Sequence, residues 1–151
     1  MRLHALALAT LLALPFAADA APATPPAYDA ELAKSLGADE RGMRAYVLVI
    51  LKTGPNKMAE GEARTNMFKG HFANMGKLAG EKKLVLAGPL DGKEGRRGIF
   101  VFNTPDIEAA KTWVALDPVI INGEMVAEYH KFYGSAALMM VNEVHGKIEK
   151  K

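Results

Sequence analysis

The chain has 151 residues, of which 50% are hydrophobic and 24% are charged, and its formal net charge is +2 at pH 7. A balance this even, with no basic cluster beyond short pairs, argues against a nucleic-acid partner. The absence of cysteine excludes disulfides and thiolate chemistry, so stability has to come from packing.

Residues 1–20 have the three-part layout of a secretory signal peptide. A short basic start is followed by an apolar run over 5–16 and by the small-residue cleavage signal Ala18-Asp19-Ala20. We therefore expect cleavage near Ala20 and a periplasmic or secreted mature protein. The apolar run is too short for a stable membrane span and no second run follows, so the sequence predicts no membrane role after cleavage.

Residues 21–42 carry three prolines and few large apolar side chains. This composition predicts a flexible leader with a short helical turn around 30–36. The folded domain is then expected over 43–151. Its first strand is predicted over 44–52, RAYVLVILK, because apolar and β-branched residues follow one another almost without a break.

The next segment predicts the longest helix, from about residue 57 or 59 to residue 78, with a glycine stop shortly after. Met67, His71, Met75 and Leu78 recur at spacings of four, four and three residues, so they share one helix face. A histidine is therefore expected in the middle of a surface that has to be buried.

Two strands are predicted after this helix. The first, over 84–87, is expected to break at Gly88-Pro89, and the second covers 98–103, GIFVFN, which is rich in aromatic and β-branched residues. A second helix is expected with Thr104 as its N-cap and a proline in its first position. It should end near residue 116, because the residue before a proline is disfavoured in the helical conformation.

The last predicted elements are a strand over 125–133 and a helix capped by Ser135. The element order is βαββαβ plus an extra C-terminal helix, which is the α+β, ferredoxin-like, split-βαβ arrangement. Two helices on one face leave the other sheet face uncovered. Because the strands are so apolar, we expect a homodimer that forms through this open sheet face.

Four segments occur in an order that resembles the YciI-like (YCII-related) family. They are YVLVILKTGPN, GHFANMGKLAGEKKLVLAGPL, GIFVFN and ALDPVIINGEMVAEYHKFYGSAALM, and the resemblance covers 44–140. It implies a dimeric α/β-barrel of ferredoxin-like subunits, related in fold to muconolactone isomerase. It also implies a pocket with a helix histidine and the aspartate of an Asp-Pro pair, which correspond here to His71 and to Asp117-Pro118.

A histidine paired with a carboxylate can act as a general base, because the carboxylate fixes the imidazole tautomer and stabilises its charged form. Beside an apolar pocket, the pair suits proton abstraction next to a carbonyl. We therefore expect isomerisation or elimination on a small cyclic organic acid or a hydroxyquinol-like compound. The family resemblance also points to such substrates, because one branch of the family resembles dehydrochlorinases of chlorinated hydroxyquinols. Structural roles stay open as well, His71 as a core residue and Asp117 as a turn residue. A non-catalytic ligand-binding or interaction domain is the alternative function.

Arg64 lies seven residues before His71, near the same helix face, where it could bind a substrate carboxylate or form a salt bridge. Gly88, Pro89 and Pro118 complete the predicted substrate-binding set, the first two because their turn matches the family pattern. The histidines lack metal-ligand spacing and no phosphate-binding loop is present. The sequence therefore predicts neither a metal site nor a cofactor.

Overall fold

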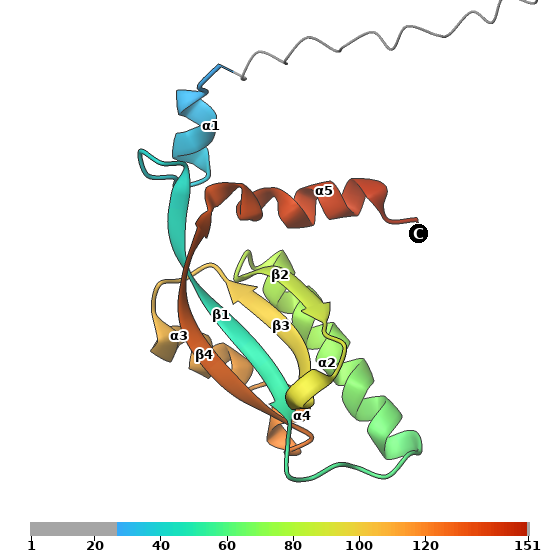
Figure 1. The fold of residues 1–151 in the computed structure, drawn as a ribbon. Helices are drawn as coiled ribbons and strands as arrows, with labels where there is room; N and C mark the ends of the chain where they lie inside the picture. The colour runs from blue at the N-terminus through green and yellow to red at the C-terminus, as the bar shows by residue number, and fades with distance from the viewer. Residues whose placement is uncertain (1–26, 151) are drawn as a thin grey trace, which may run out of the picture.

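The computed structural model describes residues 27–150 (Figure 1). The predicted signal peptide and the first part of the leader lie outside the described residues. The short helix α1 (Ala30–Ser35) confirms the helical turn expected in the leader, and Asp29 caps it by accepting a hydrogen bond from the Leu32 amide at 2.9 Å. Within 27–150, no helix is long and apolar enough to cross a membrane.

Four strands form one antiparallel sheet with the strand order β2-β3-β1-β4. The strands are β1 (Met43–Thr53), β2 (Leu84–Pro89), β3 (Arg96–Phe102) and β4 (Met125–Ser135). The helices that pack on one face of the sheet are α2 (Glu62–Gly80), α3 (Ile107–Val114) and α4 (Pro118–Ile121). Since β3 lies between β1 and β2, the unit β1–α2–β2 is a split βαβ, and the predicted ferredoxin-like α+β fold is confirmed.

Several element boundaries differ from those expected. Helix α2 begins at residue 62, because the amide of Met58 donates to the carboxylate of Glu124 at 2.7 Å and holds the preceding segment as a loop. Strand β2 does not break at Gly88, since this residue and the next one continue the ladder with β3. Helix α3 is capped by Asp106 and not by Thr104; the Asp106 side chain accepts from the Glu108 amide at 2.8 Å.

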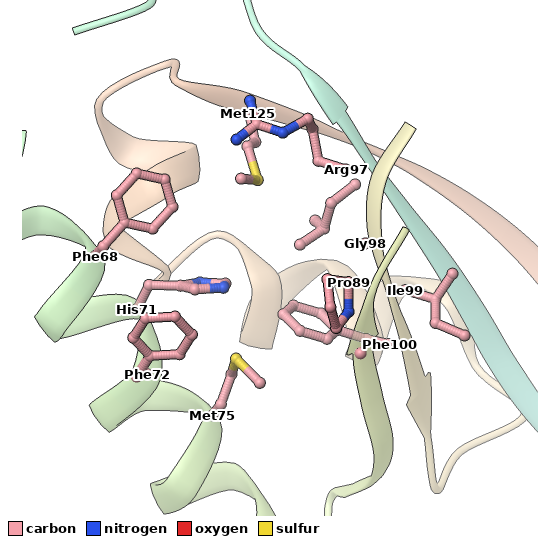
Figure 2. Close-up of a pocket in the computed structure, with 12 residues that line it drawn as sticks. Phe68, His71, Phe72, Met75, Pro89, Arg97, Gly98, Ile99, Phe100 and Met125 are labelled. Carbon is pink, nitrogen blue, oxygen red and sulfur yellow. The ribbon is translucent and has the colours of Figure 1, made fainter. Parts of the chain in front are cut away.

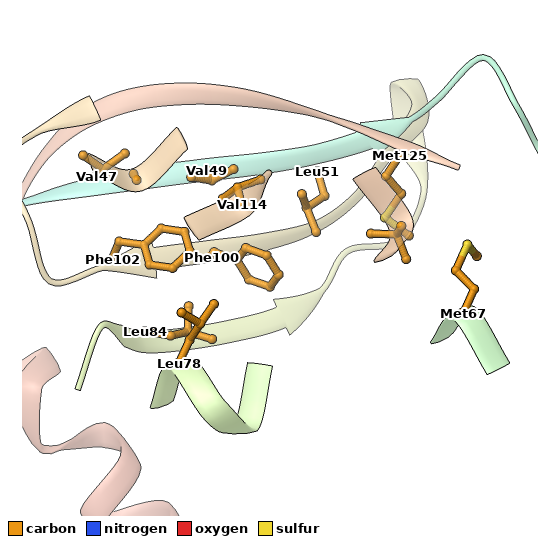
Figure 3. Close-up of a cluster of buried hydrophobic side chains, with 12 residues drawn as sticks. Val47, Val49, Leu51, Met67, Leu78, Leu84, Phe100, Phe102, Val114 and Met125 are labelled. Atoms are coloured by element: carbon orange, nitrogen blue, oxygen red, sulfur yellow. The ribbon is translucent and has the colours of Figure 1, made fainter. Parts of the chain in front are cut away.

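The main hydrophobic core lies between the sheet and the helices (Figure 3). Side chains on a strand alternate between the two faces, so every second residue of β1 and β3 points toward the helices. The buried cluster consists of Val47, Val49, Leu51, Met67, Leu78, Leu84, Phe100, Phe102, Ala110, Val114, Val119 and Met125. Both Met67 and Leu78 come from the predicted apolar face of α2.

The opposite sheet face is partly covered by the C-terminal segment of the chain itself. Its 3-10 helix η2 (Ala136–Met140) and helix α5 (Val141–Ile148) contact the sheet at one end, where a second cluster is buried around Tyr46, Val85 and Val101. The expectation of a fully uncovered face was therefore wrong, because the apolar residues of η2 pack back onto the strands. Ser135 caps η2, and not a continuous terminal helix, by accepting from the Ala137 amide.

Candidate active site

His71 and Asp117 meet, although they are 46 residues apart in the sequence. The histidine comes from the buried face of α2, and the aspartate is the N-cap of α4. The His71 Nδ1 atom lies 2.9 Å from both carboxylate oxygens, and the two residues are only 7% and 1% exposed. Asp117 also accepts from the Val119 amide at 3.1 Å and from the Asn74 side chain at 3.2 Å. The aspartate therefore both caps a helix and holds the imidazole.

A glycine permits this close approach of α2 and α4. Gly70 precedes His71, and a Cβ atom built on it would lie 3.0 Å from Cγ of Pro118. Contacts this short are tighter than ordinary van der Waals packing. The α4 proline can rest against the α2 backbone only because position 70 has no side chain, and this brings the neighbouring Asp117 within reach of His71.

The pairing determines which nitrogen of His71 carries the proton. An ionised carboxylate only accepts hydrogen bonds, so the Nδ1–H donates to Asp117, and in the neutral imidazole the lone pair is on Nε2. The ring stacks on Phe100, with 5.9 Å between ring centroids, and also lies beside Phe72 at 5.4 Å. Figure 2 shows the imidazole pointing into a cavity. Its orientation is thus fixed by the hydrogen bond to Asp117 and by two aromatic rings.

The cavity has a volume of about 260 Å³ and lies between α2 and the β2–β3 strands. Gly98 occupies a helix-facing position beside the cavity, in line with Phe100 and Phe102, and a Cβ atom built on it would lie 3.0 Å from the Gly88 carbonyl oxygen of β2. The lining residues are Leu51, Phe68, His71, Phe72, Met75, Gly88, Pro89, Arg97, Gly98, Ile99, Phe100 and Met125. Apolar groups predominate, with His71 and Arg97 as the two ionisable side chains.

Of the residues predicted from the sequence, His71, Gly88 and Pro89 line this cavity, and Asp117 supports His71 from behind. Pro118 and Arg64 are not among the described residues that line it. Pro118 packs against α2, as described above. The guanidinium of Arg64 is bound by Glu124 at 2.8 Å and by Glu60 at 3.1 Å. Arg64 therefore forms a salt bridge, which the sequence left open as the alternative to binding a substrate carboxylate.

The Arg64–Glu124 pair is a structural feature that the sequence did not reveal. Glu124 is fully buried and its carboxylate accepts from both Arg64 and the Met58 amide. The hydrogen bond from Arg64 lowers the pKa of Glu124 against the opposing effect of burial, and the bond to Glu124 in turn raises the pKa of Arg64. Both groups remain charged at neutral pH and join α2 to the turn that precedes β4.

Arg97 and Asn74 are the site residues that sequence reasoning missed. Asn74 lies one turn after His71 on α2 and donates to Asp117, a geometry that only the folded chain reveals. Arg97 belongs to the basic pair 96–97, which carries no motif. Among residues 27–150, no group of three or more histidine, aspartate or glutamate side chains lies close enough together to hold a metal ion.

The fold and the site together define a ferredoxin-like α+β protein with a histidine–aspartate pair that faces an apolar cavity. The family model of the YCII-related domain matches residues 45–132, which is more than half of the chain. The chain therefore belongs to the YCII-related family, and the resemblance inferred from its motifs is confirmed.

No curated protein matches this sequence. One solved structure with detectable similarity is 5-chloro-2-hydroxyhydroquinone dehydrochlorinase from Burkholderia phenoliruptrix AC1100, in complex with 2,5-dihydroxybenzoquinone. The two chains share 17% sequence identity with a TM-score of 0.44, over 58% of this chain and 92% of that chain.

Proposed function

We propose that this chain is an exported member of the YCII-related family in which His71 transfers protons on a small cyclic organic acid or a hydroxyquinol-like compound. The observation that carries the proposal is the His71–Asp117 contact, with Nδ1 bonded to a buried carboxylate while the ring faces the cavity. This arrangement leaves Nε2 as a proton acceptor directed at whatever the cavity holds.

The proposed reaction begins when Nε2 removes a proton from a carbon next to a carbonyl group of the ring. The C–H electron pair forms an enolate, and Asp117 stabilises the imidazolium that results. Return of the proton to another carbon gives isomerisation. If a leaving group departs with its bonding electrons from the adjacent carbon, the result is elimination. Both outcomes are redox-neutral, so the proposal includes no cofactor.

The size of the cavity supports a single-ring ligand. An apolar cavity of roughly 150 Å³ is large enough to hold benzene. The cavity here, at about 260 Å³, has room for one ring with a few substituents. Its aromatic walls, Phe68, Phe72 and Phe100, suit the faces and edges of a planar ring.

Non-catalytic binding of a small ligand is the second candidate function. The observation that favours it is that His71 is the single general acid or base among the described residues that line the cavity. One residue would have to remove the proton and also return it. A cavity that only binds needs no such residue, so a ligand could bind there without being turned over.

Two experiments in sequence test the proposal. A thermal-shift screen of the mature protein against cyclic acids, lactones and hydroxyquinols identifies a ligand through the stabilisation that binding confers. Proton NMR in D₂O then follows the entry of deuterium into that ligand. We expect exchange with the wild type. With His71→Ala, the exchange rate should fall by about a hundredfold or more.

His145→Ala is the matched control, since His145 lies on α5 with an exposed side chain and does not line the cavity. Full exchange in His71→Ala would contradict the role of His71. Binding by the wild type with no exchange for any ligand would favour the non-catalytic alternative.

We further propose that the mature protein is a homodimer that forms through the sheet face not covered by η2 and α5. The part of that face that η2 and α5 leave uncovered carries Ile50 and Ile99, which are half-buried, and Val126, which is 45% exposed. The Lys52–Glu128 ion pair lies on the same face. Covering these apolar side chains with a second copy would remove them from water.

A further inference from the structure

Arg97 is the one cationic side chain among the described residues that line the cavity. It is half-buried, and Figure 2 shows it extending over the cavity toward Met125. Within 27–150, no carboxylate lies at ion-pair distance from its guanidinium, and no side-chain hydrogen bond is formed by it. The neighbouring Arg96, by contrast, is exposed and pairs with Glu94 at 2.8 Å.

A β-bulge explains why Arg97 reaches the cavity. In the β1–β3 ladder, Leu51 pairs with Gly98 but the next residue, Lys52, pairs with Arg96, so Arg97 is the extra residue of a bulge. In a regular strand, the neighbours of a helix-facing residue such as Gly98 point to the opposite sheet face. Bulges are known to redirect side chains at the edges of functional sites. Here the bulge brings an arginine to the cavity side.

One candidate counter-ion for Arg97, Glu124, is already occupied. Glu124 is bound by Arg64 and by the Met58 amide. The pKa of Glu124 is lowered first by the Arg64 hydrogen bond and, in addition, by the charge of Arg97, although the two do not form an ion pair. The positive charge of Arg97 therefore faces a mostly apolar cavity without a protein partner among the described residues.

We propose that Arg97 is a specificity-determining residue that binds an anionic oxygen of the ligand, a carboxylate or a phenolate on a single ring. A guanidinium suits this role because its planar donor fork can make charge-assisted hydrogen bonds to such oxygens. The ligand would then span from β3 to α2, with its charged end at Arg97 and its reacting part at His71. This inference rests on the proposed single-ring ligand. It adds that the ligand carries a negative charge and that Arg97 recognises this charge.

The test compares two ring probes of nearly equal shape, benzoate and benzamide, which differ in charge. Their dissociation constants are measured by ligand-observed NMR titration for the mature wild type, Arg97→Gln, Arg97→Lys and the control Arg96→Gln. We expect the wild type and Arg96→Gln to bind benzoate about tenfold tighter than benzamide. Arg97→Gln should lose that preference while it keeps its affinity for benzamide, and Arg97→Lys should retain part of the preference.

Circular dichroism checks that each variant is folded, and Arg97→Lys tests the assignment if Arg97→Gln does not fold. Equal binding of both probes by the wild type, or a benzoate preference that survives in Arg97→Gln, would overturn the role of Arg97 and leave proton transfer by His71 intact. Failure of the wild type to bind either probe would overturn this role together with the single-ring ligand. Loss of the preference in Arg97→Gln, with deuterium exchange unchanged in His71→Ala, would support Arg97 and reject His71 as the base.

Discussion

At the scale of single residues, Asp117 shows how one side chain can be structural and functional at once. Its carboxylate accepts from the Val119 amide at the start of α4, and the same carboxylate accepts from His71 and Asn74. The helix cap therefore anchors the group that orients the imidazole. An aspartate before a proline is common at helix starts, so the structural role alone would explain its presence.

Replacing Asp117 separates these two roles. Asp117→Ala removes the cap and leaves buried donors of His71 and Val119 without acceptors, so we expect the free energy of unfolding to fall by about 2–4 kcal/mol. Asp117→Asn keeps an acceptor for the cap, so its loss of unfolding free energy should be less than half as large. It should still lower the rate of deuterium exchange into the ligand. Urea unfolding measures the first effect and NMR the second. Equal stability losses in the two variants would contradict the capping role.

The buried Arg64–Glu124 pair makes a specific contribution to stability against acid. The pKa of Glu124 is lowered in the folded chain, below the ordinary value of 4.5 that it has when it is unfolded. A group with a lowered folded pKa stabilises the protein above its unfolded pKa, and this stabilisation is lost as the pH falls through the folded pKa. We therefore expect the wild type to lose more unfolding free energy between pH 6 and pH 3 than Glu124→Gln does.

Urea titrations of both proteins at the two pH values measure this difference. The other carboxylates contribute equally to the pH dependence of both proteins, so their contributions cancel in the comparison. Glu124→Gln should also be less stable than the wild type at pH 6, since it leaves the largely buried Arg64 with only the exposed Glu60 as a counter-ion. Identical pH dependence in the two proteins would show that the pair does not couple folding to protonation.

At the scale of elements, the site depends on how closely α2 approaches α4. Gly70 has the Pro118 ring against it, whereas Gly76, further along the same helix, is exposed, and a Cβ atom added there would meet nothing within 4 Å. The two glycines are equivalent in helix propensity, so any difference between them reflects packing.

This pair of glycines gives a matched prediction. Gly76→Ala should stabilise the protein by about 0.5–1 kcal/mol, because alanine is the better helix former and meets no neighbour. Gly70→Ala should instead destabilise it by about 1–3 kcal/mol, since Pro118 has to move, and exchange by His71 should slow as Asp117 moves with it. Thermal unfolding and NMR provide the measurements. A stabilising Gly70→Ala with full exchange would contradict the packing argument.

At the scale of the whole molecule, the two faces of the sheet are covered by different means. Helices α2, α3 and α4 cover one face, and the segment of η2 and α5 covers one end of the other. Asn142 helps to hold this segment in place, since its side chain donates to the Leu84 carbonyl at 2.8 Å. The part of this face that remains uncovered is the surface to which we assign the dimer.

The dimer is tested with Val126→Lys, which puts a charge on the uncovered sheet face. We expect the wild type to sediment as a dimer and the variant to have a dissociation constant at least about tenfold higher, because an apolar contact is replaced by a charge. Ile121→Lys is the control: Ile121 is 67% exposed on α4, on the helical side of the sheet. A monomeric wild type, or equal effects of the two substitutions, would contradict a dimer through this face.

Much of the fold could be predicted because its signals are local. Continuous β-branched and apolar runs indicated β1 and β3, and the four-, four- and three-residue spacing indicated the buried face of α2, including His71. The short helix α4 was missed, since four residues are too few to show a period. The start of α2 was placed too early, because the loop before it is held by Glu124, which is 66 residues away from Met58 in the sequence.

The amino-acid sequence by itself determined the order of the elements, the family and the presence of a buried histidine, because all three depend on neighbours along the chain. Only the tertiary structure decided which residues share the site. It brought Asp117 to His71, paired Arg64 with Glu124 and brought Arg97 to the cavity through a bulge. Each of these depends on strand register or on helix packing, where a shift of one residue sends a side chain to the other face.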